Sequence, residues 1–221
     1  LPSSGKSTFL RMLSGVLTPD EGSIEIDGMK VFENPACKEK FFFISDEAYF
    51  FLNATPDEMA RFYERMYPSY DRSRYEKLME NFGLNRRRKI STFSKGMKKQ
   101  LAILCGICAN PRYLLCDETF DGLDPVMRDA FRRTISEETW DRGMVTILAG
   151  HNQQEMEDIC DCVGFLHEGN LLTVGDMDTV VSGIYRIQFA AEEPVPDESL
   201  SPLEPLRIQR QGRLCVLTVK G

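Results

Sequence analysis

The sequence predicts an α/β fold in which a parallel sheet core carries an inserted helical subdomain and a small C-terminal β appendage. Short apolar runs alternate with helical patterns in residues 1–45 and 112–182, which is typical of a parallel sheet covered on both faces. Residues 46–111 are helical in pattern, and residues 183–221 contain strand patterns on either side of an acidic linker. The chain has 221 residues, 42% of them apolar, which suffices for one domain with a subdomain.

The first elements are expected to be a helix and short strands. A helical face that ends at Gly15 comprises Phe9, Leu10, Met12 and Leu13. Ile24 and Ile26 alternate with polar residues, as in a half-buried strand, and residues 41–44 form an apolar run typical of a buried strand.

Three helices are predicted in the inserted subdomain. The first begins with a capping box, in which Thr55 is the N-cap and Glu58 the acid three positions later. The second has its apolar residues within 75–82. The third begins at Ser94 and ends before Pro111. Its apolar face comprises Met97, Leu101, Leu104, Cys105 and Cys108.

Strand patterns return after the helical subdomain. Residues 113–116 and 145–149 are apolar runs on either side of a helix that is expected after Pro125. Residues 162–174 predict a hairpin, and residues 214–219 predict a last strand.

The N-terminus carries part of a phosphate-binding motif. Gly5, Lys6 and Ser7 fit the last three positions of G-x-x-x-x-G-K-[ST], a loop whose amides and following helix bind phosphate oxygens. Lys6 would offset phosphate charge and the Ser7 hydroxyl would hold Mg²⁺. A plain turn-to-helix junction is the alternative for this motif taken alone. The first glycine would precede Leu1, so we expect the chain to begin inside the loop, with roughly 30 to 45 residues upstream that supply the central strand.

Two adjacent acids follow the strand at 113–116. Asp117 is placed to share Mg²⁺ with Ser7, and Glu118 to polarise a water molecule. An ordinary solvated strand end would explain an isolated Asp-Glu pair. The phosphate-binding motif upstream favours the catalytic interpretation.

In order and spacing these motifs resemble those of the ATP-binding subunits of ABC transporters, with a lean towards bacterial exporters. The resemblance covers residues 1 to about 180, and it implies a P-loop NTPase core that binds ATP and Mg²⁺ and hydrolyses ATP. The matching segments are KST at 6–8, FSKGM at 93–97, LLCDE at 114–118, FDGLD at 120–124 and His151 after the strand VTILAG.

The resemblance implies a role for each matching residue. Glu118 would orient or deprotonate the attacking water, and His151 would contact the γ-phosphate from the opposite side. Ser7 and Asp117 would hold Mg²⁺. The residues expected to bind nucleotide, in this subunit or across a dimer, are Ser3, Ser4, Gly5, Lys6, Ser7, Thr8, Asp46, Ser94, Gly96 and Asp124.

The signature peptide is expected to act across that dimer. Ser94 and the amide of Gly96, at the start of a helix, would complete the site of a second ATP-binding subunit, and Asp124 would connect the two sites. The peptide departs from the family's LSGGQ at Lys95 and Met97.

The segment after the strand at 41–44 also departs from the family. Asp46 stands where a glutamine is common, and an ionised acid cannot donate a hydrogen bond, although it can reach Mg²⁺ through water. Phe50, Phe51 and Leu52 either dock a partner, which the resemblance implies is a permease helix, or pack under the helical subdomain.

Two other patterns have a structural explanation. Cys105 and Cys108 have metal-like C-x-x-C spacing, but they fall on an apolar helix face, which favours buried thiols over zinc. A basic run at 86–89 predicts a solvated face, with partner contact or electrostatics at the dimer phosphates as alternatives. The run is extended by Lys95, Lys98 and Lys99.

Composition limits the partners. The net charge of −7 argues against a protein that coats nucleic acid, and no apolar stretch approaches a membrane span, so we expect any membrane role to be peripheral. Scattered cysteines favour reduced thiols inside the cell. The resemblance implies an integral membrane permease as partner and a location on the cytoplasmic face of the cell membrane. The alternative is a soluble ABC-type ATP switch, or a regulator with little turnover, that acts without a permease.

Overall fold

The computed structural model describes residues 5–152, 156–182, 184–191, 195–203, 205, 207–211 and 214–220. The contacts of the chain separate it into two compact units, Leu1–Ile159 and Cys160–Gly221. The finer division into core, helical subdomain and appendage stays a prediction. None of the helices in the described ranges is both long enough and apolar enough to span a bilayer.

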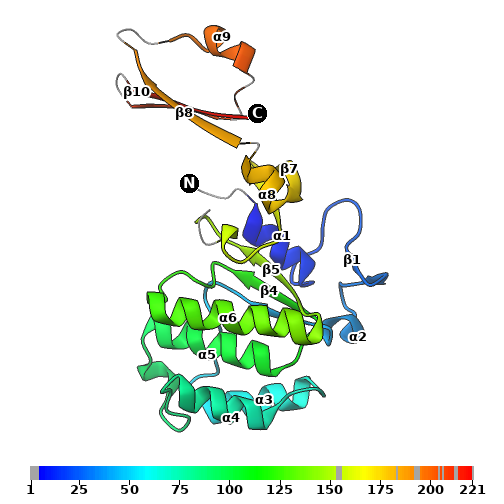
Figure 1. The fold of residues 1–221 in the computed structure, drawn as a ribbon. Helices are drawn as coiled ribbons and strands as arrows, with labels where there is room; N and C mark the ends of the chain where they lie inside the picture. Colours follow the sequence, from blue (N-terminus) through cyan, green and yellow to red (C-terminus); the bar gives the residue numbers. More distant parts are fainter. Residues whose placement is uncertain are drawn as a thin grey trace. The chain divides into compact units, whose positions relative to one another are not determined.

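The first unit is built around a parallel sheet. Its strands are β3 (Phe41–Ile44), β4 (Tyr113–Asp117) and β5 (Val145–Ala149), in the order β3-β4-β5. Helix α1 (Lys6–Leu13) lies on one side of these strands, and α5 (Lys95–Cys108) and α6 (Pro125–Arg142) lie on the other (Figure 1). This arrangement confirms the expected α/β fold with helices on both faces.

Short elements connect α1 to the sheet. Strands β1 (Glu25–Ile26) and β2 (Met29–Lys30) pair antiparallel, and α2 (Pro35–Lys38) leads into β3. The strand expected at Ile24 and Ile26 is present as the two-residue β1, which pairs with β2.

Helical elements fill the region between β3 and β4. Helix α3 (Pro56–Met66) has the expected capping box, because the Glu58 amide donates to Thr55 Oγ1 at 3.3 Å and the Thr55 amide donates to Glu58 Oε2 at 2.8 Å. Helix α4 (Arg72–Asn81) and the short 3₁₀ helix η1 (Ile90–Thr92) follow.

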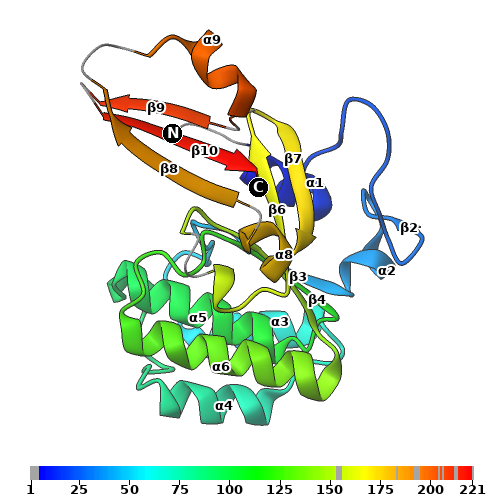
Figure 2. The same cartoon turned by 45° about the horizontal axis from the view of Figure 1, so that its top comes forward.

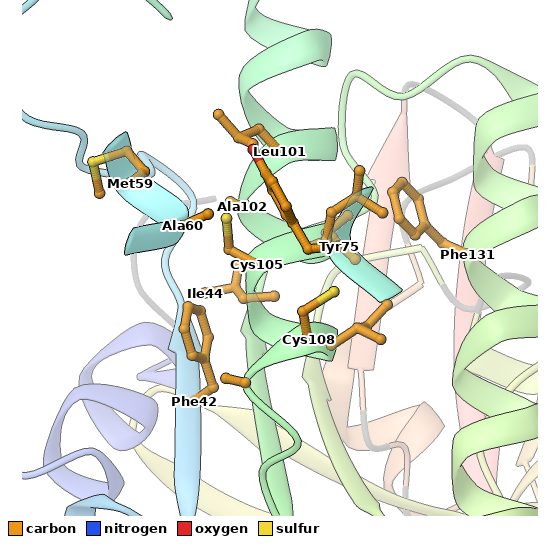
Figure 3. Packing of buried hydrophobic residues seen from close by; sticks show 14 of the residues in the cluster. Phe42, Ile44, Met59, Ala60, Tyr75, Leu101, Ala102, Cys105, Cys108 and Phe131 are labelled. Atoms are coloured by element: carbon orange, nitrogen blue, oxygen red, sulfur yellow. The ribbon is translucent and has the colours of Figure 1, made fainter. Parts of the chain in front are cut away.

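Helix α5 is buried on all sides along residues 99–108, because β3 contacts it on one side and α3 and α4 on the other. Figure 3 shows Cys105 and Cys108 among Phe42, Ile44 and other core side chains. Burial raises the pKa of the Cys108 thiol to about 12 and also raises that of Cys105. Since the thiolate is the metal ligand, this burial supports structural thiols.

The second unit is mainly antiparallel. Strands β6 (Cys162–His167) and β7 (Asn170–Asp176) form the hairpin expected from the sequence, and α8 (Met177–Ser182) follows. A second sheet has the order β8-β10-β9, visible in Figure 2. Its strands are β8 (Ile184–Ala190), β9 (Arg207–Gln211) and β10 (Leu214–Lys220), with α9 (Asp197–Leu200) and the 3₁₀ helix η2 (Ser201–Leu203) between β8 and β9.

Candidate functional site

The phosphate-binding motif and the acidic strand end meet in the structure. Gly5 precedes α1 with a φ of 93°, a left-handed conformation that favours glycine. Ser7, in the first turn of α1, donates a hydrogen bond from Oγ to Asp117 Oδ1 at 2.9 Å. Asp117 ends β4 and is only 3% exposed. Two residues that are 110 positions apart in sequence therefore form one polar site.

The Ser7–Asp117 pair fits a magnesium ion. Mg²⁺ prefers oxygen ligands, and it is commonly bound through one or two protein oxygens together with substrate phosphates. A buried carboxylate beside a hydroxyl supplies such oxygens, at the point where α1 begins. Ser7 and Asp117 are accordingly the residues of this chain that could hold the ion.

Glu118 has a strained backbone conformation next to this pair. Its φ is 48°, in the left-handed region that non-glycine residues rarely adopt. The Glu118 amide donates to the Ala149 carbonyl oxygen at 2.9 Å, and the Glu118 carbonyl oxygen accepts a hydrogen bond from Lys99 Nζ at 2.6 Å. Both peptide groups of Glu118 are therefore held in place, and the direction of its side chain with them.

The side chain of Glu118 meets His151, which follows β5. His151 Nδ1 lies 3.0 Å from Glu118 Oε2 and 4.0 Å from Asp121 Oδ2. An ionised carboxylate can only accept hydrogen bonds, so Nδ1 carries the hydrogen in this contact. The pair leaves the imidazole 66% exposed at the carboxyl end of the sheet. Sequence reasoning missed Asp121, and its signal is the first acid of FDGLD.

The signature peptide begins α5 as the sequence predicts. Ser94 is exposed, and its Oγ accepts a hydrogen bond from the Met97 amide at 3.1 Å. A Cβ atom at Gly96 would lie 3.2 Å from the Gly122 carbonyl oxygen, so a larger residue would press on the segment that leads into α6. Asp124 caps α6 by accepting from the Met127 amide at 3.0 Å.

Asp46 and Lys99 form an ion pair beside the site. Lys99 Nζ lies 3.0 Å from Asp46 Oδ1, and the side chain of Lys99 is 3% exposed, whereas that of Asp46 is 46% exposed. The expectation that Lys99 belongs to a solvated basic face is wrong, because α5 packs between the sheet and the other helices and the ammonium has two acceptors. Lys95 is exposed, as that expectation requires.

The remaining predicted residues lie at the start of the chain. Thr8 is exposed in the first turn of α1, after Lys6 and Ser7. Ser3 and Ser4 lie outside the described residues.

Known proteins are similar to this chain in sequence and in fold. The family model described as ABC transporter matches residues 2–121. The chain is 28% identical over 192 residues to the ABC transporter ATP-binding protein YtrB of Bacillus subtilis. The aligned region covers 87% of this chain and 66% of YtrB. It is 30% identical over 185 residues to the ABC transporter ATP-binding protein NatA of the same organism, covering 80% of this chain and 74% of NatA.

A solved structure agrees with the sequence comparisons. The structure described as an ATP binding subunit of an ABC transporter superposes with a TM-score of 0.74 at 26% identity, and covers 82% of this chain and 78% of that one. Together with the parallel sheet and the Ser7–Asp117 contact, this match confirms the P-loop NTPase core. The chain belongs to the ABC transporter family.

Proposed function

We propose that this chain is the ATP-binding and ATP-hydrolysing subunit of an ABC transporter, and that it drives a separate membrane permease through ATP-dependent dimerisation. One observation carries the proposal: Asp117, which lies 2.9 Å from Ser7, is followed in the chain by Glu118, which lies 3.0 Å from His151. The oxygens of Ser7 and Asp117 suit a metal ion that binds together with phosphates. The carboxylate of Glu118 suits the orientation and deprotonation of a water molecule.

Each residue would contribute one step to hydrolysis. Lys6 and the amides at the start of α1 would bind phosphate oxygens, while Ser7 and Asp117 would hold Mg²⁺, which when bound neutralises charge on the phosphates. Glu118 would orient the attacking water and accept its proton. His151, whose Nδ1 lies 3.0 Å from Glu118 Oε2, would contact the terminal phosphate.

Dimerisation would complete the site from a second subunit, either another copy of this chain or a related one. Ser94 is exposed at the first turn of a 14-residue helix, where unpaired amides and the helix dipole favour an anion. Ser94 and Gly96 of one subunit would then contact the phosphates bound by the other. Asp124, exposed at the start of α6, would connect the two sites.

An aromatic patch beside Asp46 supports the permease as a partner. Tyr49 and Leu52 are 75% and 90% exposed, and Phe51 packs edge-on against Phe62 of α3 at a centroid distance of 4.9 Å. A hollow adjoins this patch. It is lined by Phe51, Glu58, Arg61, Phe62 and Arg65. An apolar floor with charged edges fits a helix of a membrane protein, which would place this subunit on the cytoplasmic face of the membrane.

The ATPase rate of the full-length protein tests the dimer. We expect the specific rate to rise with protein concentration, because each site needs a second subunit. Glu118→Gln should keep ATP binding and accumulate a nucleotide-bound dimer in size-exclusion chromatography, and full turnover in this variant would contradict the assignment of the base. Absence of hydrolysis at every concentration, with and without the permease, would instead favour a nucleotide-binding regulator.

A further inference from the structure

Lys99 is a buried cation that the proposed reaction does not use. Its side chain is 3% exposed, and its ammonium makes two polar contacts, to Asp46 Oδ1 at 3.0 Å and to the Glu118 carbonyl oxygen at 2.6 Å. A buried charge is costly unless it is paired and hydrogen-bonded. Asp46 supplies the opposite charge, and the Glu118 carbonyl supplies a second acceptor.

The second contact falls on the most constrained residue of the site. A non-glycine residue at a φ of 48° keeps this conformation only where its surroundings hold it. The Glu118 amide is held by the Ala149 carbonyl of β5, and the Glu118 carbonyl oxygen accepts from Lys99 Nζ at 2.6 Å and from the Asp121 amide at 3.3 Å. With Lys99 removed, the Glu118 carbonyl oxygen would lose its shorter hydrogen bond and keep the 3.3 Å one from the Asp121 amide.

We propose that Lys99 is a positioning residue of the ATPase site, which holds the Glu118 main chain and thereby aims its carboxylate, with Asp46 as the counter-charge that makes the buried ammonium tolerable. The proposal rests on the proposed function, in which Glu118 acts on the attacking water. Lys99 lies five residues after Ser94 in the same helix. The end of α5 that would bind the partner's nucleotide is thus connected to the residue that would act on the water in its own site.

The test compares variants of the full-length protein in steady-state ATPase assays. Lys99→Met keeps the length of the side chain and removes the charge and the donor. We expect kcat to fall by about 10- to 100-fold, because small misplacements of a catalytic group have effects of this size, with KM for ATP within about twofold of wild type. Lys99→Arg, which retains charge and donors, should recover most of the rate. Lys77→Met, at an exposed position of α4, is the matched control.

A double-mutant cycle separates positioning from general stability. If the effect of Asp46 on kcat passes through Lys99, then Asp46→Asn should add little to the loss in Lys99→Met. The proposal is overturned if Lys99→Met has the kcat of wild type, or if the losses of kcat from the two substitutions multiply in the double variant. It is also overturned if the loss of kcat comes with an equal fold-change in KM and a lower melting temperature. A full-length wild type without ATPase activity would instead refute the proposed function, so the two failures are distinguishable.

Discussion

Glu138 is the buried acid that joins α6 to α4. Its side chain is 7% exposed, and its carboxylate accepts hydrogen bonds from Arg74 of α4 and from Arg142 of α6. Glu138→Gln keeps the shape but removes the charge, which leaves two guanidinium groups facing each other. Breaking a fully buried ion pair costs about 3–5 kcal/mol. Since both arginines are a quarter to a third exposed, we expect the free energy of unfolding to fall by about 2–4 kcal/mol.

The loss of unfolding free energy can be measured as a fall in melting temperature. A loss of about 2–4 kcal/mol in a chain of this size lowers the melting temperature by about 4–16 °C. Circular dichroism during heating and urea titration both measure the change. Glu137→Gln is the control, because Glu137 is exposed, is the adjacent residue and carries the same charge. Unfolding free energies that agree within about 0.5 kcal/mol for the two variants would refute the reasoning, since surface substitutions have effects of that size.

Three further predictions follow from the same structure. Burial raises the pKa of Glu138, but the hydrogen bonds from its arginine partners outweigh burial and lower the pKa below its ordinary 4.5. The stability that ionised Glu138 contributes is present above its pKa in the unfolded chain and is lost as pH falls through its lower pKa in the folded chain. The difference in unfolding free energy between wild type and Glu138→Gln should therefore narrow as pH falls below 4.5 in acid denaturation. Ser7→Ala should weaken ATP binding by about tenfold with Mg²⁺ and much less without it, as measured by titration of a fluorescent nucleotide, and an equal loss in both conditions would argue against the metal role. Gly106→Ala should destabilise the protein to urea by about 1–2 kcal/mol, because the added Cβ would lie 3.0 Å from Phe42 and 3.2 Å from Ile44, and a gain in stability would contradict this packing.

Local signals in the sequence located the helix starts well. The first turn of α3 shows the reason: Thr55 and Glu58 satisfy each other's amides, so the cap depends on residues only three positions apart. The hairpin β6–β7 was likewise predictable from its turn residues. The strand expected at Ile24 and Ile26 is present as β1, but the alternation does not show that its partner is the two-residue β2.

Proximity of the site residues was predictable only in part. Asp117 ends β4 and His151 follows β5, and side chains at the carboxyl ends of neighbouring parallel strands gather at one edge of the sheet. The 2.9 Å contact between Asp117 and Ser7 was anticipated from motif chemistry, because both residue types suit the same ion. The contact between His151 and Glu118 depends on the left-handed turn at Glu118, which no residue type in the sequence indicates.

The burial and the polar partners of Lys99 could not be predicted from the sequence. In sequence it continues a run of lysines, and a helix that is apolar on one face would leave such a run in water. In the structure α5 is enclosed from residue 99 onward, so a lysine there needs partners from elements that are distant in sequence. Asp46 and the Glu118 carbonyl provide them from the ends of β3 and β4. Because the same helix carries Ser94 at its exposed end, a ligand that moved α5 would also move the lysine that donates to the Glu118 carbonyl.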